Sequence, residues 1–197
     1  MIVFEDVDGF KFEFKDALNA YIFDEKDTHS PHFHGGFMKG VDIIAEYEEA
    51  YVFIELKDYD DEFAAKYNVL PYRQQTSEPS EEEQEQEKEV RKSFKWLKNY
   101  LKYKYRDTFL YRYAEAQEDK PVHYICLITF EDALNSIMRK SLSDELPIGK
   151  KGRRWVNGIA KSCQVLNVNT WNRNFAHTNE THRTFFKCTV THLAGEN

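Results

Sequence analysis

Residues 40–59 read GVDIIAEYEEAYVFIELKDY, two apolar runs separated by the pair Glu48-Glu49. Both runs, Val41 to Tyr47 and Tyr51 to Lys57, are rich in β-branched and aromatic residues. Such residues favour strands, so this stretch predicts two consecutive strands joined by a two-residue turn.

The register of the pair decides where its charged residues lie. A turn at the two glutamates pairs Tyr47 with Ala50, and the same ladder sets Asp42 opposite Glu55. Lys57 shares a face with Glu55, because side chains alternate along a strand. The Glu-Glu turn is not a favoured hairpin sequence, and a slip of one residue moves Asp42 to the other face.

Each acid interrupts an apolar run. An ionised side chain is costly to bury there unless it is paired or binds a metal. Two carboxylates and an ammonium group on one face would form a cation site with a charged group beside it. The alternative is that Glu55 and Lys57 form a surface ion pair on an edge strand.

Apolar spacing and turn residues predict the remaining elements. In the helix predicted from 81 to 112, we expect the apolar stripe to consist of Phe94, Leu97, Leu101 and Tyr105. In the helix predicted over 131–146, the apolar residues at helical spacing are Leu134, Ile137, Met138 and Leu142. The order indicates an α/β domain around a mixed sheet. The predicted elements are a hairpin over 2–14 turning near Asp8-Gly9, a helix over 16–25 with Asp16 as a possible N-cap, a surface loop over 58–80, a helix from 81 to 112, a strand over 122–130, a helix over 131–146, a strand over 163–169 and an edge strand over 185–190.

Composition places the chain among globular proteins. It has 197 residues, 41% of them hydrophobic, enough for one domain with a sizeable core. No signal peptide or membrane span is visible in the sequence, so we expect no membrane partner. The three cysteines, Cys126, Cys163 and Cys188, lack CxxC spacing, and reduced thiols in a cytoplasmic protein are the simplest interpretation.

The net charge of −7 hides separate blocks of charge. Residues 1–62 carry 17 acids and 5 basic residues. Residues 90–113 carry eight basic residues and one acid, and residues 139–161 carry seven and two. Because a polyanion responds to the local field, an acidic chain of this kind does not exclude nucleic acid.

The residues Val41-Asp42 followed by Glu55-Leu56-Lys57 resemble the PD-(D/E)xK nuclease superfamily, which has the restriction-endonuclease-like fold. The resemblance implies that Asp42, Glu55 and the Leu56 carbonyl bind Mg²⁺ or Mn²⁺, and that Lys57 assists the attacking water. Val41 stands where the family has proline, a position that the family often relaxes.

The resemblance covers about residues 16–130 of a single domain spanning 1–197. The hairpin 1–14 and the extension 131–197 lie outside the common core. The family often adds an acid from its first helix, for which Asp16, Asp24 and Glu25 are open alternatives. Many nucleases of this fold pair to cut both strands, so a homodimer is one option.

Phosphodiester chemistry fits these residue types. Mg²⁺ prefers carboxylate oxygens, lowers the pKa of bound water and neutralises developing charge. A neighbouring lysine can hold the water or the phosphate. The sequence therefore predicts a metal-dependent nuclease acting on DNA, with a non-catalytic nucleic-acid-binding or protein-interaction module on the same fold as the alternative. The nucleic acid, the strand and base specificity, the oligomeric state and the pathway remain open.

Two basic segments are candidate nucleic-acid contacts. The first is the aromatic helix that carries Lys95, Lys98 and Lys102 beside Trp96, and its alternative is an ordinary solvated lysine face. The second is a loop whose exposed arginines suit phosphate, and its alternative is a solubilising loop. The basic residues of that loop are Lys150, Lys151, Arg153 and Arg154.

Three histidines, His29, His32 and His34, lie just before the first of the two strands. His32 and His34 would share a face in an extended chain and could bind a transition metal. Because no further ligand pair with metal spacing follows, we expect loop histidines at the rim of the site.

Overall fold

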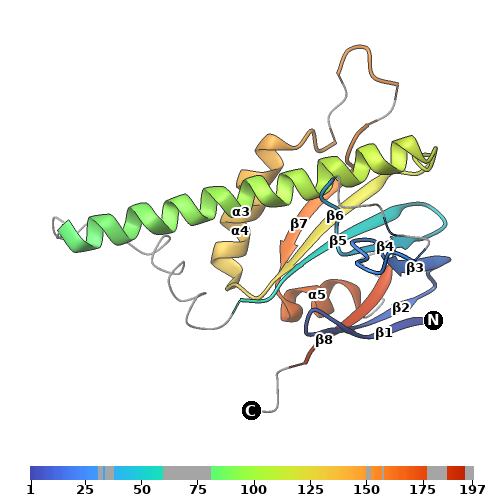
Figure 1. The fold of residues 1–197 in the computed structure, drawn as a ribbon, viewed down its shortest axis with the longest axis horizontal. Coiled ribbons are helices and arrows are strands. Elements are labelled where there is room, and N and C mark those ends of the chain that lie inside the picture. Colours follow the sequence, from blue (N-terminus) through green and yellow to red (C-terminus); the bar gives the residue numbers. More distant parts are fainter. Residues whose placement is uncertain are drawn as a thin grey trace.

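The computed structural model describes residues 1–30, 33, 38–59, 81–149, 152–156, 158–176 and 186–193. In these ranges the strands form a sheet of five and a sheet of three (Figure 1). The strands are β1 (Ile2–Val7), β2 (Phe10–Lys15), β3 (Asn19–Ile22), β4 (Ile43–Glu46), β5 (Tyr51–Lys57), β6 (Val122–Ile128), β7 (Ser162–Leu166) and β8 (Lys187–His192). The helices are α3 (Glu81–Ala114), α4 (Asp132–Glu145) and α5 (Val168–Phe175).

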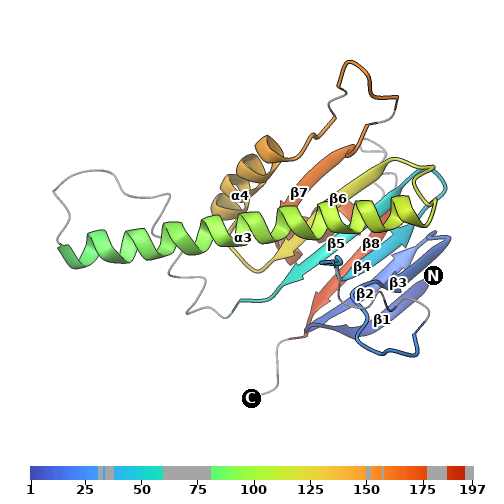
Figure 2. The same cartoon turned by 45° about the horizontal axis from the view of Figure 1, so that its top comes forward.

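The larger sheet has the order β3-β4-β5-β6-β7. Its first three strands are antiparallel, and β5, β6 and β7 are parallel, so the predicted α/β domain with a mixed sheet is confirmed. Parallel neighbours need a crossover connection, and α3 and α4 supply the two crossovers. Right-handed crossovers that advance in one direction place their helices on one face of the sheet. Figure 2 shows α3 and α4 side by side on that face.

The buried stripes of the two helices are largely as predicted. Leu97, Leu101 and Tyr105 of α3 are fully buried, and Leu134, Met138 and Leu142 of α4 pack into the same core cluster. Ile137, which shares the helical spacing in the sequence, is 41% exposed. It lies one position before Met138, and on a helix that places it off the buried stripe.

The opposite face of the five-stranded sheet packs against the smaller sheet, ordered β1-β2-β8, and against α5. Phe10, Phe12 and Phe14 alternate along β2 and are fully buried in this second core. The predicted hairpin turn is confirmed: Asp8 and Gly9 have φ of 50° and 84°, the positive values that a two-residue hairpin turn requires. The predicted edge strand is β8, which pairs with β2.

The helix predicted over 16–25 is wrong. Asp16 has φ of 61° and caps no helix, and Asn19 to Ile22 form β3 instead. Backbone pairing decides this, because Ile22 pairs with Ile43 of β4 and Phe23 N donates to Asp42 O at 2.8 Å. The apolar residues of this segment serve two faces, so tertiary pairing overrides their helical spacing.

The strand predicted over 163–169 ends at Leu166, and α5, which was not predicted, follows at once. Asn167 is its N-cap: Asn167 Oδ1 accepts a hydrogen bond from Thr170 N at 2.9 Å. Trp171 and Phe175, one helical turn apart, are the buried residues of α5. The sequence contains a signal for this helix, namely an asparagine at the N-cap followed by two large apolar residues four positions apart.

All three cysteines are buried, and none of them forms a disulfide bond. The predicted loop 58–80 lies, from residue 60 onward, outside the described residues. Among the helices that the structure describes, none combines the length and the apolar character that crossing a membrane requires.

Candidate active site

The predicted register of the central strand pair is confirmed. Tyr47 N donates to Ala50 O at 2.9 Å, and Ile43 pairs with Ile54, so the ladder continues to Asp42 opposite Glu55. Asp42 lies one residue before β4 begins, and Glu55 lies within β5. Their carboxylates are on the face that α3 covers, because both contact the same side chain of that helix.

Asp42 is held by the backbone of the neighbouring strand. Its Oδ2 accepts a hydrogen bond from Leu56 N at 2.6 Å, and the residue is only 7% exposed. Burial raises the pKa of the Asp42 carboxyl, although Lys104, Lys57 and this hydrogen bond act in the opposite direction. The bond leaves Oδ1 directed at the space between the sheet and α3, where it lies 3.5 Å from Lys104 Nζ.

Glu55 is fully buried. Its Oε1 lies 2.7 Å from Lys57 Nζ and its Oε2 lies 3.5 Å from Lys104 Nζ. Within the described residues neither oxygen accepts a hydrogen bond of good geometry, although both have an ion-pair partner. Burial and the nearby Asp42 carboxylate raise the pKa of Glu55 to about 8 and outweigh the attraction of the two lysines. A buried carboxylate that lacks hydrogen bonds is suited to binding a divalent cation, which carries more charge than either of the two lysines supplies.

Lys104 of α3 contacts the acids of this cluster, where the sequence analysis did not place it. Its Nζ lies 2.8 Å from Asp24 Oδ2 and 3.5 Å from both Asp42 Oδ1 and Glu55 Oε2. The side chain is 3% exposed, which is rare for a lysine unless it is paired. A signal was present: Lys104 follows Leu101 by three positions and Leu97 by seven, so it lies on the buried stripe of the helix.

Lys57 lies at the mouth of the site. Its Nζ donates to Leu56 O at 2.6 Å and contacts the Glu55 carboxylate. Burial lowers its pKa, but the carboxylates of Glu55 and Asp42 outweigh that effect and leave it raised, so the side chain is an ammonium ion. Lys57 Nζ also lies 5.1 Å from the centre of the Tyr100 ring, which Lys104 and Lys39 approach as well. The negative face of the aromatic ring attracts each of the three ammonium groups, and this attraction offsets part of the repulsion among them.

A pocket of about 380 Å³ opens above these residues. Its wall combines the hairpin turn between β1 and β2, the end of β3 and the middle of α3, so both sheets contribute. Acids outnumber lysines around it, which favours a cation over a bare phosphate. The charged lining residues are Asp6, Asp8, Asp24, Glu25, Asp42, Lys26, Lys57 and Lys104.

The oxygens around Lys104 are of the chemical type that binds a divalent metal ion. They are hard carboxylate oxygens, and those of Glu55 lack a hydrogen bond. Their spacing fits an ammonium ion instead, because they lie 2.8–3.5 Å from Nζ, whereas Mg²⁺ takes oxygens at about 2.0–2.1 Å. In the described part of the chain no three acidic, histidine or cysteine side chains are close enough to hold a metal as they stand.

Of the three acids considered for a first helix, Asp24 is the one that reaches this cluster, through Lys104. It does so from the end of a strand, since residues 16–25 contain no helix. Asp16 instead lies 3.5 Å from Lys187 Nζ. Glu25 lines the pocket without contacting the cluster.

The predicted nucleic-acid residues that the structure describes lie outside the pocket. Lys98 and Lys102 both pair with Glu145 of α4, Lys102 at 2.5 Å, so one carboxylate within the fold partly neutralises their two charges. Lys95, Arg153 and Arg154 are exposed, and none of these five residues lines the pocket. Lys150 and Lys151 lie outside the described residues, as do His32 and His34. Their roles in binding stay predictions.

Comparison with models of known protein families, with curated proteins and with solved structures gave no match.

Proposed function

We propose that this protein is a divalent-metal-dependent nuclease that hydrolyses phosphodiester bonds in DNA, built on a restriction-endonuclease-like core. The observation that carries the proposal is the convergence of Asp42, Glu55 and Lys57 on one face of the sheet, beside a pocket that Asp42 and Lys57 both line. The fully buried position of Glu55 supports it, because a structural ion pair does not require a carboxylate at that depth.

Asp42, Glu55 and the Leu56 carbonyl are the groups that would hold Mg²⁺ or Mn²⁺. When bound, the ion supplies an acidified water and compensates charge on the phosphate. Lys57 positions the attacking water or a phosphate oxygen, since its ammonium group reaches the pocket from beside Glu55. For that role Lys57 exchanges its contact with the Leu56 carbonyl for a contact with substrate.

Lys104 has a separate role in this proposal. Its ammonium group holds Asp24, Asp42 and Glu55 together before the metal binds, because the buried carboxylates of Asp42 and Glu55 and the partly exposed carboxylate of Asp24 would otherwise repel one another. With these oxygens engaged by a divalent ion, the Lys104 ammonium group would be released from them and would be able to neutralise charge on the phosphate. Lys104 is therefore proposed as a positioning residue.

The second candidate is a non-catalytic nucleic-acid-binding or protein-interaction module on the same scaffold. Lys104 is the observation that favours it, since an internal ammonium ion already balances the carboxylates and leaves no need for a metal. In either case we propose a cytoplasmic location, in keeping with three unbonded thiols. A homodimer stays a prediction.

Calorimetric titration with Mg²⁺ and Mn²⁺ distinguishes the two candidates. The nuclease proposal predicts saturable binding that Asp42→Asn weakens at least tenfold. Glu25→Gln is the matched control, because it removes one charge from the same pocket without touching the cluster. If the wild type binds neither ion while DNA still shifts in a gel, the module is correct and the nuclease is not.

A further inference from the structure

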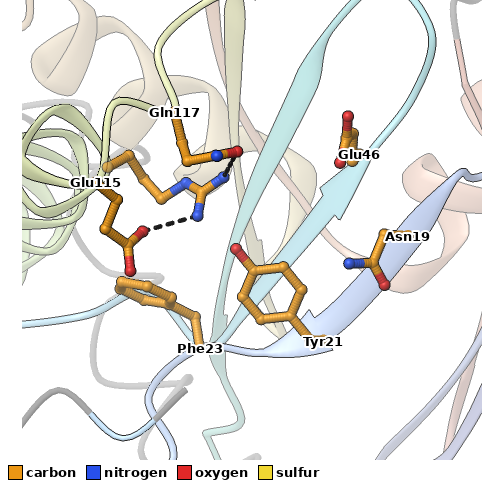
Figure 3. A pocket seen from close by; sticks show the side chains of 7 residues that line it. Asn19, Tyr21, Phe23, Glu46, Glu115 and Gln117 are labelled. Atoms are coloured by element: carbon orange, nitrogen blue, oxygen red, sulfur yellow. Dashed lines mark hydrogen bonds and ion pairs between the residues drawn. The ribbon is translucent and has the colours of Figure 1, made fainter. Parts of the chain in front are cut away.

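A second pocket, of about 350 Å³, lies between β3 and the C-terminal end of α3 (Figure 3). β3 contributes Asn19 and Tyr21, Phe23 follows the strand, and the helix and the turn after it contribute Arg112 and Gln117. The same segment and helix border the candidate active site, through Ile22 and Asp24 on one side and Tyr100 and Lys104 on the other. The two pockets therefore follow one seam of the molecule.

The charges around the second pocket cancel. Arg112 Nη1 lies 2.8 Å from Glu115 Oε2, and Lys120 Nζ lies 2.5 Å from Glu46 Oε1. A phosphate group would find no unpaired cation among these residues, and a metal ion no unpaired carboxylate. The pocket is therefore suited to an uncharged ligand.

Two side-chain amides, those of Asn19 and Gln117, supply hydrogen-bonding groups to the pocket. Gln117 uses its oxygen to accept from Arg112 Nη2 at 3.2 Å, which leaves its amide N–H groups. Figure 3 shows Gln117 and Asn19 on two sides of the pocket, with the Tyr21 ring between them and its hydroxyl directed toward the side of Gln117 and Glu115.

One aromatic ring is accessible beside these groups. Tyr21 is partly exposed and lines the pocket with its ring, and Phe23, which is buried, packs behind it with the ring centres 6.4 Å apart. Burial raises the pKa of Tyr21 to about 12, so its hydroxyl remains a donor at neutral pH. Aromatic rings for stacking, together with amide and guanidinium groups for a polar edge, are what proteins use to hold an unpaired base.

We propose that this pocket binds one nucleobase of a single-stranded nucleic acid whose backbone crosses the candidate active site. The strand part of this inference rests on the proposed function, whereas the base pocket does not. From Lys104 to Arg112 is eight helical residues, about 12 Å along α3. At about 3.4 Å per nucleotide of a stacked strand, the recognised base lies three or four nucleotides from the reacting phosphate.

The test uses the full chain in EDTA, so that no cleavage interferes. Free nucleosides are titrated into the wild type, into the double variant Asn19→Ala with Gln117→Ala, and into Asn99→Ala, an amide control outside the pocket. In a second arm, a labelled ten-nucleotide single strand is compared with strands that carry one abasic site at each position. We expect the double variant to weaken nucleoside binding about tenfold and one abasic position to weaken strand binding by about 5- to 150-fold, the range of one stacked base.

Absence of saturable nucleoside binding in the wild type, or equal binding by the double variant, overturns the base pocket. Nucleoside binding combined with identical affinities for all abasic strands overturns the strand part and assigns the pocket to a free nucleoside. Cleavage measured separately with Mg²⁺ keeps the two proposals distinct, because a protein that binds nucleosides but does not cut refutes the nuclease alone.

Discussion

At the scale of single residues, Lys104 is the centre of the site. Removing its charge leaves Asp24 and the buried Asp42 and Glu55 without their common partner. We expect Lys104→Met to lower the free energy of unfolding by about 3–5 kcal/mol in the absence of divalent ions, the usual effect of breaking a buried ion pair. Urea unfolding measures it.

The same variant responds to metal. If Mg²⁺ binds the vacated oxygens, a concentration 100 times the dissociation constant restores about 2.7 kcal/mol. Lys92→Met, an exposed lysine of the same helix, is the control and should change stability by less than about 0.5 kcal/mol. Equal unfolding curves for the two variants would contradict the role of Lys104.

Glu55 makes stability depend on pH. Its pKa of about 8 in the folded protein exceeds the ordinary value of 4.5, so the folded state holds the proton more tightly than the unfolded state. This contribution to stability is complete below pH 4.5 and is lost as the pH rises through about 8. A tenfold difference in proton affinity corresponds to about 1.4 kcal/mol, so this difference in pKa predicts that the free energy of unfolding falls by about 4 kcal/mol between about pH 5 and 9.

Glu55→Gln removes this titrating group and should flatten the fall in stability over the same pH range. Urea unfolding at a series of pH values, without divalent ions, gives both slopes. Glu48→Gln, at the exposed turn between β4 and β5, is the matched control. A slope that Glu55→Gln leaves as steep as in the wild type would exclude Glu55 as the source.

At the scale of elements, the central strand pair was predictable to the residue because two constraints agree. Alternation along β4 and β5 and the two-residue turn between them both require Asp42 opposite Glu55. β3 was not predictable in this way, because its partner strand begins more than twenty positions later in the chain. The spacing of apolar residues within a segment does not show that the segment pairs with a strand so far away in the sequence.

The site was predictable only in part for a related reason. Asp42, Glu55 and Lys57 are neighbours through one strand pair, so sequence spacing brings them together. Asp24 and Lys104 are eighty positions apart and meet only because α3 crosses the sheet beside the end of β3. Asp6 and Asp8, at the hairpin turn between β1 and β2, also reach the pocket only through tertiary packing, in their case the packing of the smaller sheet.

The contact between α3 and α4 gives a prediction at this scale. Hydrogen bonds from Lys102 and Lys98 lower the pKa of Glu145 to about 2. This contribution to stability is present above pH 4.5 and is lost as the pH falls toward 2. Because Glu145 is partly exposed, we expect Glu145→Gln to cost only about 1 kcal/mol or less at neutral pH, measured by urea unfolding.

Glu145→Gln also tests the predicted nucleic-acid role of the two lysines. Freed from Glu145, Lys98 and Lys102 should tighten DNA binding at low salt and steepen its salt dependence. Fluorescence anisotropy at several salt concentrations measures both. If affinity and slope stay at the wild-type values, these lysines serve the contact between the helices and not the nucleic acid.

At the scale of the whole molecule, two helices, a mixed sheet and a smaller sheet with α5 form successive layers (Figure 2). The candidate active site lies where the layers meet, at one end of β4 and β5, and the second pocket continues the same seam along α3. Cleavage of DNA is the function that this arrangement supports best.

The most direct measurement is nicking of circular DNA by the purified protein with Mg²⁺ or Mn²⁺ and with EDTA. We expect the wild type to cut only with the ion, and Asp42→Asn and Lys57→Ala to lose at least 100-fold in rate while they remain folded by circular dichroism. Cutting that persists undiminished in both variants would contradict the assignment of Asp42, Glu55 and Lys57 as the catalytic centre.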